Sequence, residues 1–490
     1  MIAGTPTARP ASSAGGPTPA PPLVRRLGEA LRAHGVVYCQ WKGHGRPQRW
    51  ATGVGDIDFL VDRPSLDGFT EVAARLGFKL ALPRPGTLVP GQVSYFGFDP
   101  QLQRLVHLHV HCQLIVGSYW TATYRVPIEA AVLATSVPGD VFNIPTAEFG
   151  LILAALRTVQ HYSPGAVLRP EARRLADARD ELGQLCARVT PARLREVLRE
   201  HLPVIDQAFF ERCLKSVDPD VSSWERLRLR AGLHRRLRAH VRQPGAWTAF
   251  ATRARWALTL GGRLGRAAPS PKRFLRGGVV LALVGGDGAG KSTSVRALFA
   301  WLSGDFAVMQ AHLGRPPRSL VTLLVGGALK VSTWLARLGP AGRPSYLELL
   351  RTVCTARDRY NLYVSARRFA AAGGIALCER YPVAQNRSIV GPGIPALLEG
   401  ISPSRLATLL LEWEASYYRR ILPPDVLLVL RVHPEIAVRR KTDEPADYVR
   451  TRARIVWNTH WTGTRAHLVN ADRSFADVVD ELKAIIWAEL

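Results

Sequence analysis

The stretch LALVGGDGAGKST, residues 281–293, decides the fold of the C-terminal part of the chain. Within it, residues 285–292 match the pattern Gly-x-x-x-x-Gly-Lys-Ser/Thr. Glycines allow successive backbone N–H groups to turn toward phosphate oxygens, the lysine supplies a charge for the β- and γ-phosphates, and the serine hydroxyl completes the shell of a Mg²⁺ ion. The alternative is an ordinary glycine-rich turn. The residues expected to hold the phosphates are Gly285, Gly286, Asp287, Gly288, Ala289, Gly290, Lys291, Ser292 and Thr293.

The residues on either side favour a phosphate-binding loop. Residues 279–284 (VVLALV) have the continuous apolar character of a strand covered on both faces of a parallel sheet. Residues 291–302 carry apolar side chains at helical spacing, and the positive N-terminal end of such a helix attracts phosphate. Further strands are predicted at 375–378, 425–432 and 466–471, with helical segments between them. This alternation predicts a parallel α/β sheet with helices on both faces over residues 277–490.

Several stretches of this region resemble the thymidylate kinase family of nucleoside monophosphate kinases. GGDGAGKST resembles that family's phosphate loop, and GGIALCERYP (373–382) resembles its strand ending in Asp-Arg-Tyr, with Glu379 at the Asp position. The helix before that strand carries the family's Asp-Arg pair as Asp358 and Arg359, and VLRVHPEIAVRRKTDEP resembles the segment leading into a mobile lid. The resemblance covers residues 278–490. It implies an ATP- and Mg²⁺-dependent phosphotransferase acting on a nucleoside monophosphate or another small phosphorylated molecule.

The resemblance also implies roles for individual residues. Arg359 and Arg380 would grip the phosphate of the acceptor, Asp287 would reach its sugar, and Ser292 and Glu379 would lie beside Mg²⁺. Because Ala289 stands where some members carry an arginine, catalytic charge would come from Lys291 and Arg380 and from Arg439 and Arg440 in the lid. The alternative for each arginine is a solvated helix surface in an arginine-rich chain.

The same region departs from the family in three places. HLGRPPRS (312–319) replaces the family's Arg-Glu-Pro-Gly-Gly segment, and an apolar insertion follows it at 320–339. PVAQNRSIVGPGIP, after Tyr381, lacks the usual residues that hold thymine. The resemblance therefore does not identify the acceptor molecule.

A second candidate site lies near the N-terminus, in WKGHGRPQRWATGVGDIDFLVDR (41–63). Asp56 and Asp58 are two residues apart on a predicted strand and so point to one face, where both could hold Mg²⁺ for a nucleoside triphosphate. Gly43 followed by this Asp-x-Asp pair resembles the signature of the nucleotidyltransferase superfamily, over about residues 36–135. That superfamily places a third carboxylate on a later strand, where this chain has RLVHLHVHCQL.

The three histidines of that strand, His107, His109 and His111, leave several interpretations open. His107 could replace the missing carboxylate, the three could form an independent transition-metal site, or they could be the polar face of a half-buried strand. Asp56 and Asp58 could likewise be structural, or remnants of a lost activity.

The composition of the chain bears on the number of its domains, its binding partners and its location in the cell. A chain of 490 residues that is 47% hydrophobic is expected to form two or three folded domains. Its 65 basic and 39 acidic residues give a net charge of +26, which indicates either phosphate, nucleic-acid or membrane contact or a codon bias toward arginine. Six cysteines without a CxxC pair, and no apolar run long enough to span a membrane, favour a cytoplasmic protein.

The sequence predicts five regions: a disordered tail (1–22), a nucleotidyltransferase-like α/β domain (23–135), a helical region (136–224), a basic helical linker (225–276) and the thymidylate kinase-like domain (277–490). The linker could contact an anionic membrane or polymer, whereas no sequence-specific nucleic-acid binding is predicted. Two rival functions remain. Nucleotidyl transfer could be the main activity, with a regulatory phosphate-loop domain, or ATP could gate docking through the linker and the insertion at 320–339.

Overall fold

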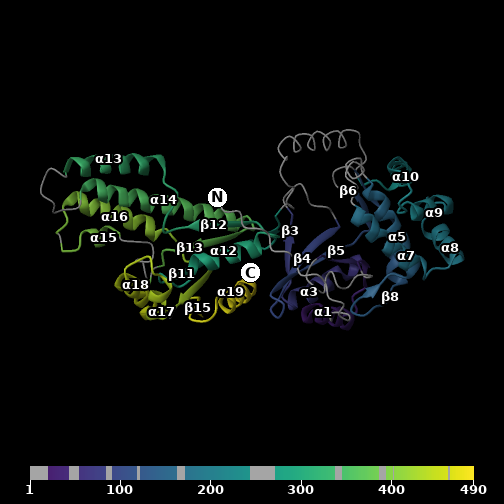
Figure 1. Cartoon of the computed structure of the whole chain (residues 1–490), viewed down its shortest axis with the longest axis horizontal. Helices are drawn as coiled ribbons and strands as arrows, with labels where there is room; N and C mark the ends of the chain where they lie inside the picture. The colour runs from purple at the N-terminus through teal and green to yellow at the C-terminus, as the bar shows by residue number, and fades with distance from the viewer. Residues whose placement is uncertain are drawn as a thin grey trace. The chain divides into compact units, whose positions relative to one another are not determined.

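The computed structural model describes residues 20–43, 55–83, 91–118, 122–162, 172–242, 271–336, 345–383, 385, 393–400, 402–461 and 464–490. The chain divides into two compact units (Figure 1). Unit 1 comprises Met1–Lys79 and Val89–Ala267, and unit 2 comprises Leu80–Leu88 and Ala268–Leu490. Both units mix helices with strands and both contain parallel strand pairs, so the predicted α/β class is confirmed.

Unit 1 begins with an α/β part. The strand order is β1-β2-β5-β4, in which β2 and β5 run parallel and the other two neighbouring pairs run antiparallel. Side chains alternate along β5: Val106, Leu108 and Val110 are buried in the core, and the three histidines between and after them face the other side. The elements of this part are α1 (Pro22–Ala33), β1 (Tyr38–Lys42), β2 (Ile57–Val61), η1 (Arg63–Ser65), α3 (Leu66–Arg75), β4 (Gln92–Asp99), β5 (Arg104–His111), β6 (Ile115–Ser118), β7 (Ala122–Arg125), α4 (Glu129–Ala134), β8 (Val137–Pro138) and β9 (Asn143–Ile144).

A helical part completes unit 1. Most side chains of α5 are buried, because α7, α8, α9 and α10 all pack around it. The hydrophobic core is continuous from Trp41 of β1 into these helices, so the regions predicted as separate domains at 23–135 and 136–224 share one core. The helices are α5 (Ala147–His161), α7 (Ala172–Cys186), α8 (Pro191–His201), α9 (Gln207–Lys215), α10 (Ser223–Arg236) and η2 (Arg238–His240).

The basic segment predicted as a linker begins inside this helical part. Ser222 caps α10 by accepting a hydrogen bond from the Glu225 N–H, and Leu229 and Leu233, four residues apart, enter the core of unit 1. Residues 225–236 are therefore a packed helix rather than a linker. Arg228 and Arg235 are exposed on it, whereas Arg226 is buried and donates hydrogen bonds to the Ser216 and Asp218 carbonyl oxygens. Residues 243–270 lie outside the described residues, as do residues 1–19 of the predicted disordered tail (1–22), whose last residue, Pro22, begins α1.

Unit 2 is built on a parallel five-stranded sheet in the order β12-β13-β11-β14-β15. The central strand β11 is buried on both faces, as its apolar sequence predicted. Val280, Ala282 and Val284 share a core with residues of α14 and α18, whereas α12 and α19 pack together on the other side of the sheet (Figure 1). The sheet consists of β11 (Val279–Gly285), β12 (Val308–His312), β13 (Ile375–Glu379), β14 (Val426–Arg431) and β15 (Ala466–Asn470). β3 (Lys79–Leu82) pairs antiparallel with β10 (Arg273–Phe274).

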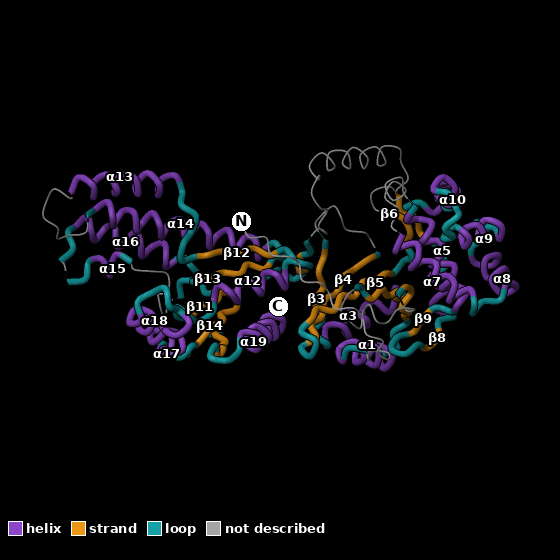
Figure 2. Tube along the Cα trace, in the orientation of Figure 1, coloured by secondary structure: helices purple, strands orange, loops and turns teal. Residues whose placement is uncertain are grey.

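Helices account for the rest of unit 2. Figure 2 shows α13, α14 and α16 side by side, and a small apolar core joins α14, α15 and α16. Ser474 caps α19 by accepting a hydrogen bond from the Asp477 N–H. The helices are α12 (Lys291–Leu302), α13 (Leu320–Ala336), α14 (Tyr346–Ala371), α15 (Ile394–Leu397), α16 (Arg405–Arg419), α17 (Pro434–Arg440), α18 (Ala446–Asn458) and α19 (Phe475–Glu489).

The apolar insertion predicted at 320–339 forms α13, as far as the described residues extend. Its large apolar side chains are exposed at Leu320, Leu324, Val331 and Trp334, while Thr322 and Leu329 are buried where the helix packs on α14. Among the described residues, no helix has both the length and the apolar character required to cross a membrane.

Candidate functional site

The glycine-rich loop leaves the carboxyl end of β11 and leads directly into α12. Its backbone takes the left-handed conformation at Gly288 (φ +80°) and at Gly290 (φ +82°), which precedes the first residue of α12. A Cβ atom at Gly286 would lie 2.8 Å from Ala453 Cα, and one at Gly288 would lie 2.6 Å from the Ala437 carbonyl oxygen. The loop therefore needs glycine because α17 and α18 lie directly against it. It sits at the carboxyl edge of a parallel sheet, where ligands of such sheets bind.

Lys291 is folded back onto this loop. Its side chain is only 6% exposed, and its Nζ donates a hydrogen bond to the Gly286 carbonyl oxygen at 2.6 Å. Burial lowers the pKa of Lys291 to about 8, and the nearby Asp287 carboxylate, 3.8 Å away, opposes this shift. The lysine thus holds its positive charge at neutral pH inside the loop.

Three cationic side chains converge on the carboxylate of Asp287. Arg380 Nη2 lies 2.8 Å from Oδ1, Arg452 Nε lies 2.7 Å from Oδ2, and Lys291 approaches from within the loop. Burial acts to raise the pKa of Asp287, but the charges of Lys291, Arg380 and Arg452 lower it below its usual range. One buried carboxylate facing three cations leaves a net positive charge, which suits a polyphosphate.

Arg452 is the member of this group that sequence reasoning missed. It lies on α18 between two other arginines, Arg450 and Arg454, and nothing in the sequence distinguishes it from them. Arg452 lies at the loop because the next residue on α18, Ala453, packs against Gly286. A helix-packing contact, rather than a motif, thus brings Arg452 to the loop.

Ser292 and Glu379 form the part of the site suited to a metal ion. The Ser292 hydroxyl donates a hydrogen bond to Glu379 Oε1 at 2.6 Å, and Glu379 is the last residue of β13, next to β11 in the sheet. His312 Nε2 lies 3.9 Å from the same oxygen. A hydroxyl and a carboxylate are oxygen donors of the kind that Mg²⁺ prefers, so these residues fit the predicted ion.

Arg380 has an unusual backbone. Its φ is +54°, and besides Gln103 it is the one non-glycine residue with positive φ in the described part of the chain. A Cβ at Gly314 would lie 2.6 Å from Arg380 Cδ, so a glycine across from it makes room for its side chain. A strained conformation of this kind persists when the surrounding structure holds it, and it brings the Arg380 guanidinium to Asp287 in the glycine-rich loop.

We expect Arg380→Ala to impair use of the acceptor more than binding of ATP. The acceptor KM should rise, or kcat should fall, by about 10²-fold, because a charge-assisted contact to a phosphate is lost. Affinity for MgATP, measured by calorimetry, should stay within a few-fold. Arg368→Ala, at an exposed position on α14, is the matched control. Collapse of ATP binding in Arg380→Ala would assign this arginine to the nucleotide instead.

The structure separates Arg359 from this group. Arg359 is buried, its Nε donates to the Leu313 carbonyl oxygen at 2.7 Å, and its guanidinium contacts the Tyr418 hydroxyl. Its neighbour Asp358 accepts hydrogen bonds from the Ser319 N–H at 3.0 Å and from the Thr322 hydroxyl at 2.5 Å. These contacts hold the segment after β12 and the start of α13 in place. They engage the Arg359 side chain, which was expected to grip the phosphate of the acceptor.

The two predicted lid arginines do not join the loop in this structure. Arg439 is exposed at the end of α17. Arg440 Nη1 donates to the Ala471 carbonyl oxygen at 2.6 Å, and its Nη2 donates to that of Asp472, just after β15. The carbonyls after β15 therefore engage Arg440, whereas Arg452 lies beside the glycine-rich loop.

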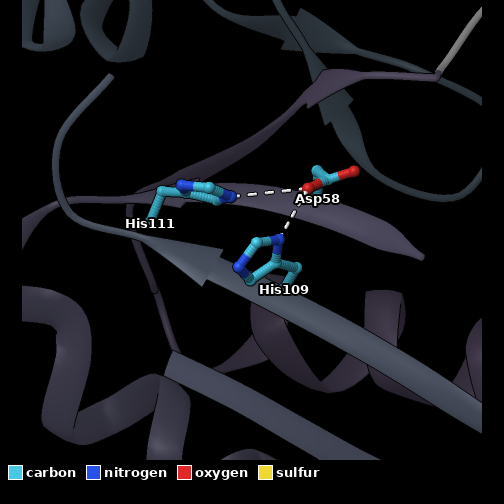
Figure 3. Close-up of side chains that lie close together, drawn as sticks. All are labelled: Asp58, His109 and His111. Atoms are coloured by element: carbon cyan, nitrogen blue, oxygen red, sulfur yellow. Dashed lines mark hydrogen bonds and ion pairs between the residues drawn. The ribbon is translucent and has the colours of Figure 1, made fainter. Parts of the chain in front are cut away.

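In unit 1, the predicted carboxylates and histidines meet across two strands. The parallel register places Asp58 opposite His109, and Asp56 Oδ1 lies 2.6 Å from His107 Nδ1. Asp58 Oδ1 lies 3.2 Å from His109 Nδ1 and 3.4 Å from His111 Nε2, as Figure 3 shows. Two carboxylates and three imidazoles thus form one continuous polar row.

A lysine side chain balances the negative charge of Asp58. Lys42 Nζ lies 2.7 Å from Asp58 Oδ1, a contact that sequence reasoning missed although it singled out the WKG segment. Burial acts to raise the pKa of Asp58, but hydrogen bonds from His109 and His111 and the charge of Lys42 hold it far below its usual range. Burial lowers the pKa of His111 to about 4. At neutral pH, Asp58 is therefore an ionised carboxylate beside a neutral imidazole.

Comparisons with known proteins do not assign either site. A scan against models of protein families gives no match, and a search of curated proteins finds no relative of this chain. The case for each site therefore rests on the contacts and chemistry of its own residues.

Proposed function

We propose that unit 2 is a phosphotransferase that uses ATP and Mg²⁺ and resembles thymidylate kinases in class. The observation that carries this proposal is the convergence of Lys291, Arg380 and Arg452 around Asp287, beside the Ser292–Glu379 pair. Phosphoryl transfer requires positioning of two substrates and neutralisation of charge on the transferred group, and little covalent chemistry from the protein. Fixed cations beside a phosphate loop meet both requirements.

Each residue then has a role defined by its position. The amides of residues 286–291 and the N-terminal end of α12 bind the donor phosphates, and the Lys291 ammonium moves from the Gly286 carbonyl to the β- and γ-phosphate oxygens. Ser292 and Glu379 would hold Mg²⁺, which supplies further charge neutralisation. Arg452, on α18, faces the transferred group from the side of the loop opposite β13.

Arg380 supports a phosphorylated acceptor. It extends from the carboxyl end of β13, the strand next to the loop, so it can hold a second anion while Lys291 holds the first. The acceptor is therefore a nucleoside monophosphate or another small phosphorylated molecule.

Nucleotidyl transfer by unit 1 has weaker support as the main activity. Asp56 and Asp58 lie beside three histidines and Lys42, and β5 supplies no third carboxylate, whereas Mg²⁺ prefers oxygen ligands. In unit 2, by contrast, Lys291 lies within the glycine-rich loop and the Ser292 hydroxyl lies beside the Glu379 carboxylate, which is the set of groups that a magnesium triphosphate requires.

The test is to incubate the full chain with γ-labelled ATP, Mg²⁺ and a panel of nucleoside monophosphates and sugar phosphates. We expect label to pass to at least one acceptor faster than ATP is hydrolysed in its absence. Tight MgATP binding without transfer to any acceptor would contradict the proposal and favour ATP-gated docking.

A further inference from the structure

Asp58, His109 and His111 form a compact set of donor atoms in unit 1 (Figure 3). One ligand atom from each residue lies within 4.8 Å of the others. Ligands that are 2.0–2.2 Å from a tetrahedral zinc ion lie about 3.3–3.6 Å from one another. The two distances from Asp58 Oδ1, 3.2 Å to His109 Nδ1 and 3.4 Å to His111 Nε2, are close to this spacing. Small rotations of the imidazoles would complete it.

The donor set indicates which kind of ion would bind. Two imidazoles and one carboxylate suit zinc, iron and similar transition metals, whereas Mg²⁺ prefers oxygen ligands and retains water. Three protein ligands leave at least one coordination position for water or a substrate, as in catalytic sites, whereas structural zinc sites use four. We propose that Asp58, His109 and His111 bind a divalent transition-metal ion with an open coordination position.

The surroundings hold the ligands in place. His111 is 2% exposed, and its other ring nitrogen, Nδ1, lies 3.1 Å from the side-chain amide of Gln92. An amide can present either its nitrogen or its oxygen, so the Gln92 oxygen can accept a hydrogen bond from the His111 Nδ1–H when Nε2 binds a metal. The Trp41 ring packs against His111 edge to face, with 5.2 Å between the ring centroids. These contacts fix the imidazole in the orientation that metal binding needs.

Lys42 occupies the place of the cation in this structure. Its ammonium lies 2.7 Å from the same Asp58 oxygen that both histidines approach, and its side chain is 29% exposed, so it can swing into solvent. A metal ion would displace it. Removal of the Lys42 charge should therefore strengthen metal binding, an effect opposite to that expected from a general loss of folding.

His107 provides a matched control on the same strand and face. It pairs with Asp56 rather than Asp58 and lies outside the set of three. If the metal used the Asp56–Asp58 pair, as in a nucleotidyltransferase, changes at Asp56 and His107 would matter. If the metal binds at the proposed site, changes at Asp56 and His107 would leave the metal affinity unaltered.

The experiment uses the full chain, stripped of metal with a chelator. Zn²⁺ binding is measured by calorimetry, and Co²⁺ is the second probe because its visible absorption reports a low coordination number and nitrogen ligation. We expect one ion per chain. His109→Ala and His111→Ala should each weaken binding by about 100-fold and Gln92→Ala by about tenfold. Lys42→Gln should strengthen it several-fold, and His107→Ala should leave it unchanged.

Several outcomes would overturn the proposal. These are no stoichiometric ion in the wild-type chain, equal affinity in His109→Ala and wild type, or a loss in His107→Ala as large as that in His111→Ala. Because His111 is buried, thermal unfolding of each variant is measured alongside. If His111→Ala does not fold, His109→Gln decides, since His109 is partly exposed and its replacement should be tolerated.

Discussion

Lys291→Ala is expected to lower phosphoryl transfer by about 10²–10³-fold, the usual loss when one preorganised charge or donor is removed from a transition state. Lys291 is buried in the loop and is positively charged at neutral pH, so it carries its charge into the site without the need to order a flexible side chain. The shorter alanine leaves the γ-phosphate without this partner. The rate is measured with saturating MgATP and whichever acceptor the panel identifies.

Lys330→Ala is the matched control for this prediction, because Lys330 is an exposed lysine on α13 of the same unit. It should transfer phosphate at the wild-type rate. Unchanged turnover in Lys291→Ala would remove the basis for the kinase proposal, since no other lysine lies in the loop.

Asp287→Ala should destabilise unit 2 in the absence of nucleotide, by about 3 kcal/mol, the scale at which a buried charge loses its partner. Without the carboxylate, Lys291, Arg380 and Arg452 face one another with only repulsion between them. A bound triphosphate would restore the missing negative charge. We therefore expect MgATP to stabilise Asp287→Ala by more than it stabilises the wild-type chain.

Hydrogen exchange of the backbone amides in β11 and α12 measures this effect locally, so that unit 1 does not obscure it. Asp447→Asn is the control, because Asp447 is also paired with an arginine of α18 but its side chain is 96% exposed. Such a surface pair contributes little, and exchange in that variant should match wild type. Equal protection in Asp287→Ala and wild type would show that the three cations do not depend on this carboxylate.

The local parts of both sites could be predicted from the sequence. The glycines, Lys291 and Ser292 lie within one short motif, and the strand and helix around them follow from apolar spacing, so neighbouring residues determine this geometry. In unit 1, alternation placed Asp56 and Asp58 on one face of a strand and the three histidines on one face of another. Which histidine meets which carboxylate depends on the register between β2 and β5, which only the folded sheet sets.

The contacts that could not be predicted are those made between helices. Arg452 reaches the loop because α18 packs against Gly286, and a sequence with three alternating arginines does not reveal that contact. The resemblance directed attention to Arg439 and Arg440, but the carbonyls after β15 bind Arg440. Residues 225–236 were interpreted as part of a linker because of their many charged side chains. The four-residue spacing of Leu229 and Leu233 already favoured a packed helix, and both residues lie in the core of unit 1.

The strand order in unit 2 bears on how the chain folds during synthesis. Leu281, at the centre of β11, pairs with Leu377 on one side and with Val426 on the other, so both neighbours of the central strand are made long after it. Parallel pairing across such separations is slow to form and leaves apolar strands exposed in the meantime. The phosphate loop can acquire its native shape only after α18 has left the ribosome, because Ala437 and Ala453 pack against its glycines. We therefore expect nascent chains that end before α18 to engage chaperones and to bind no nucleotide.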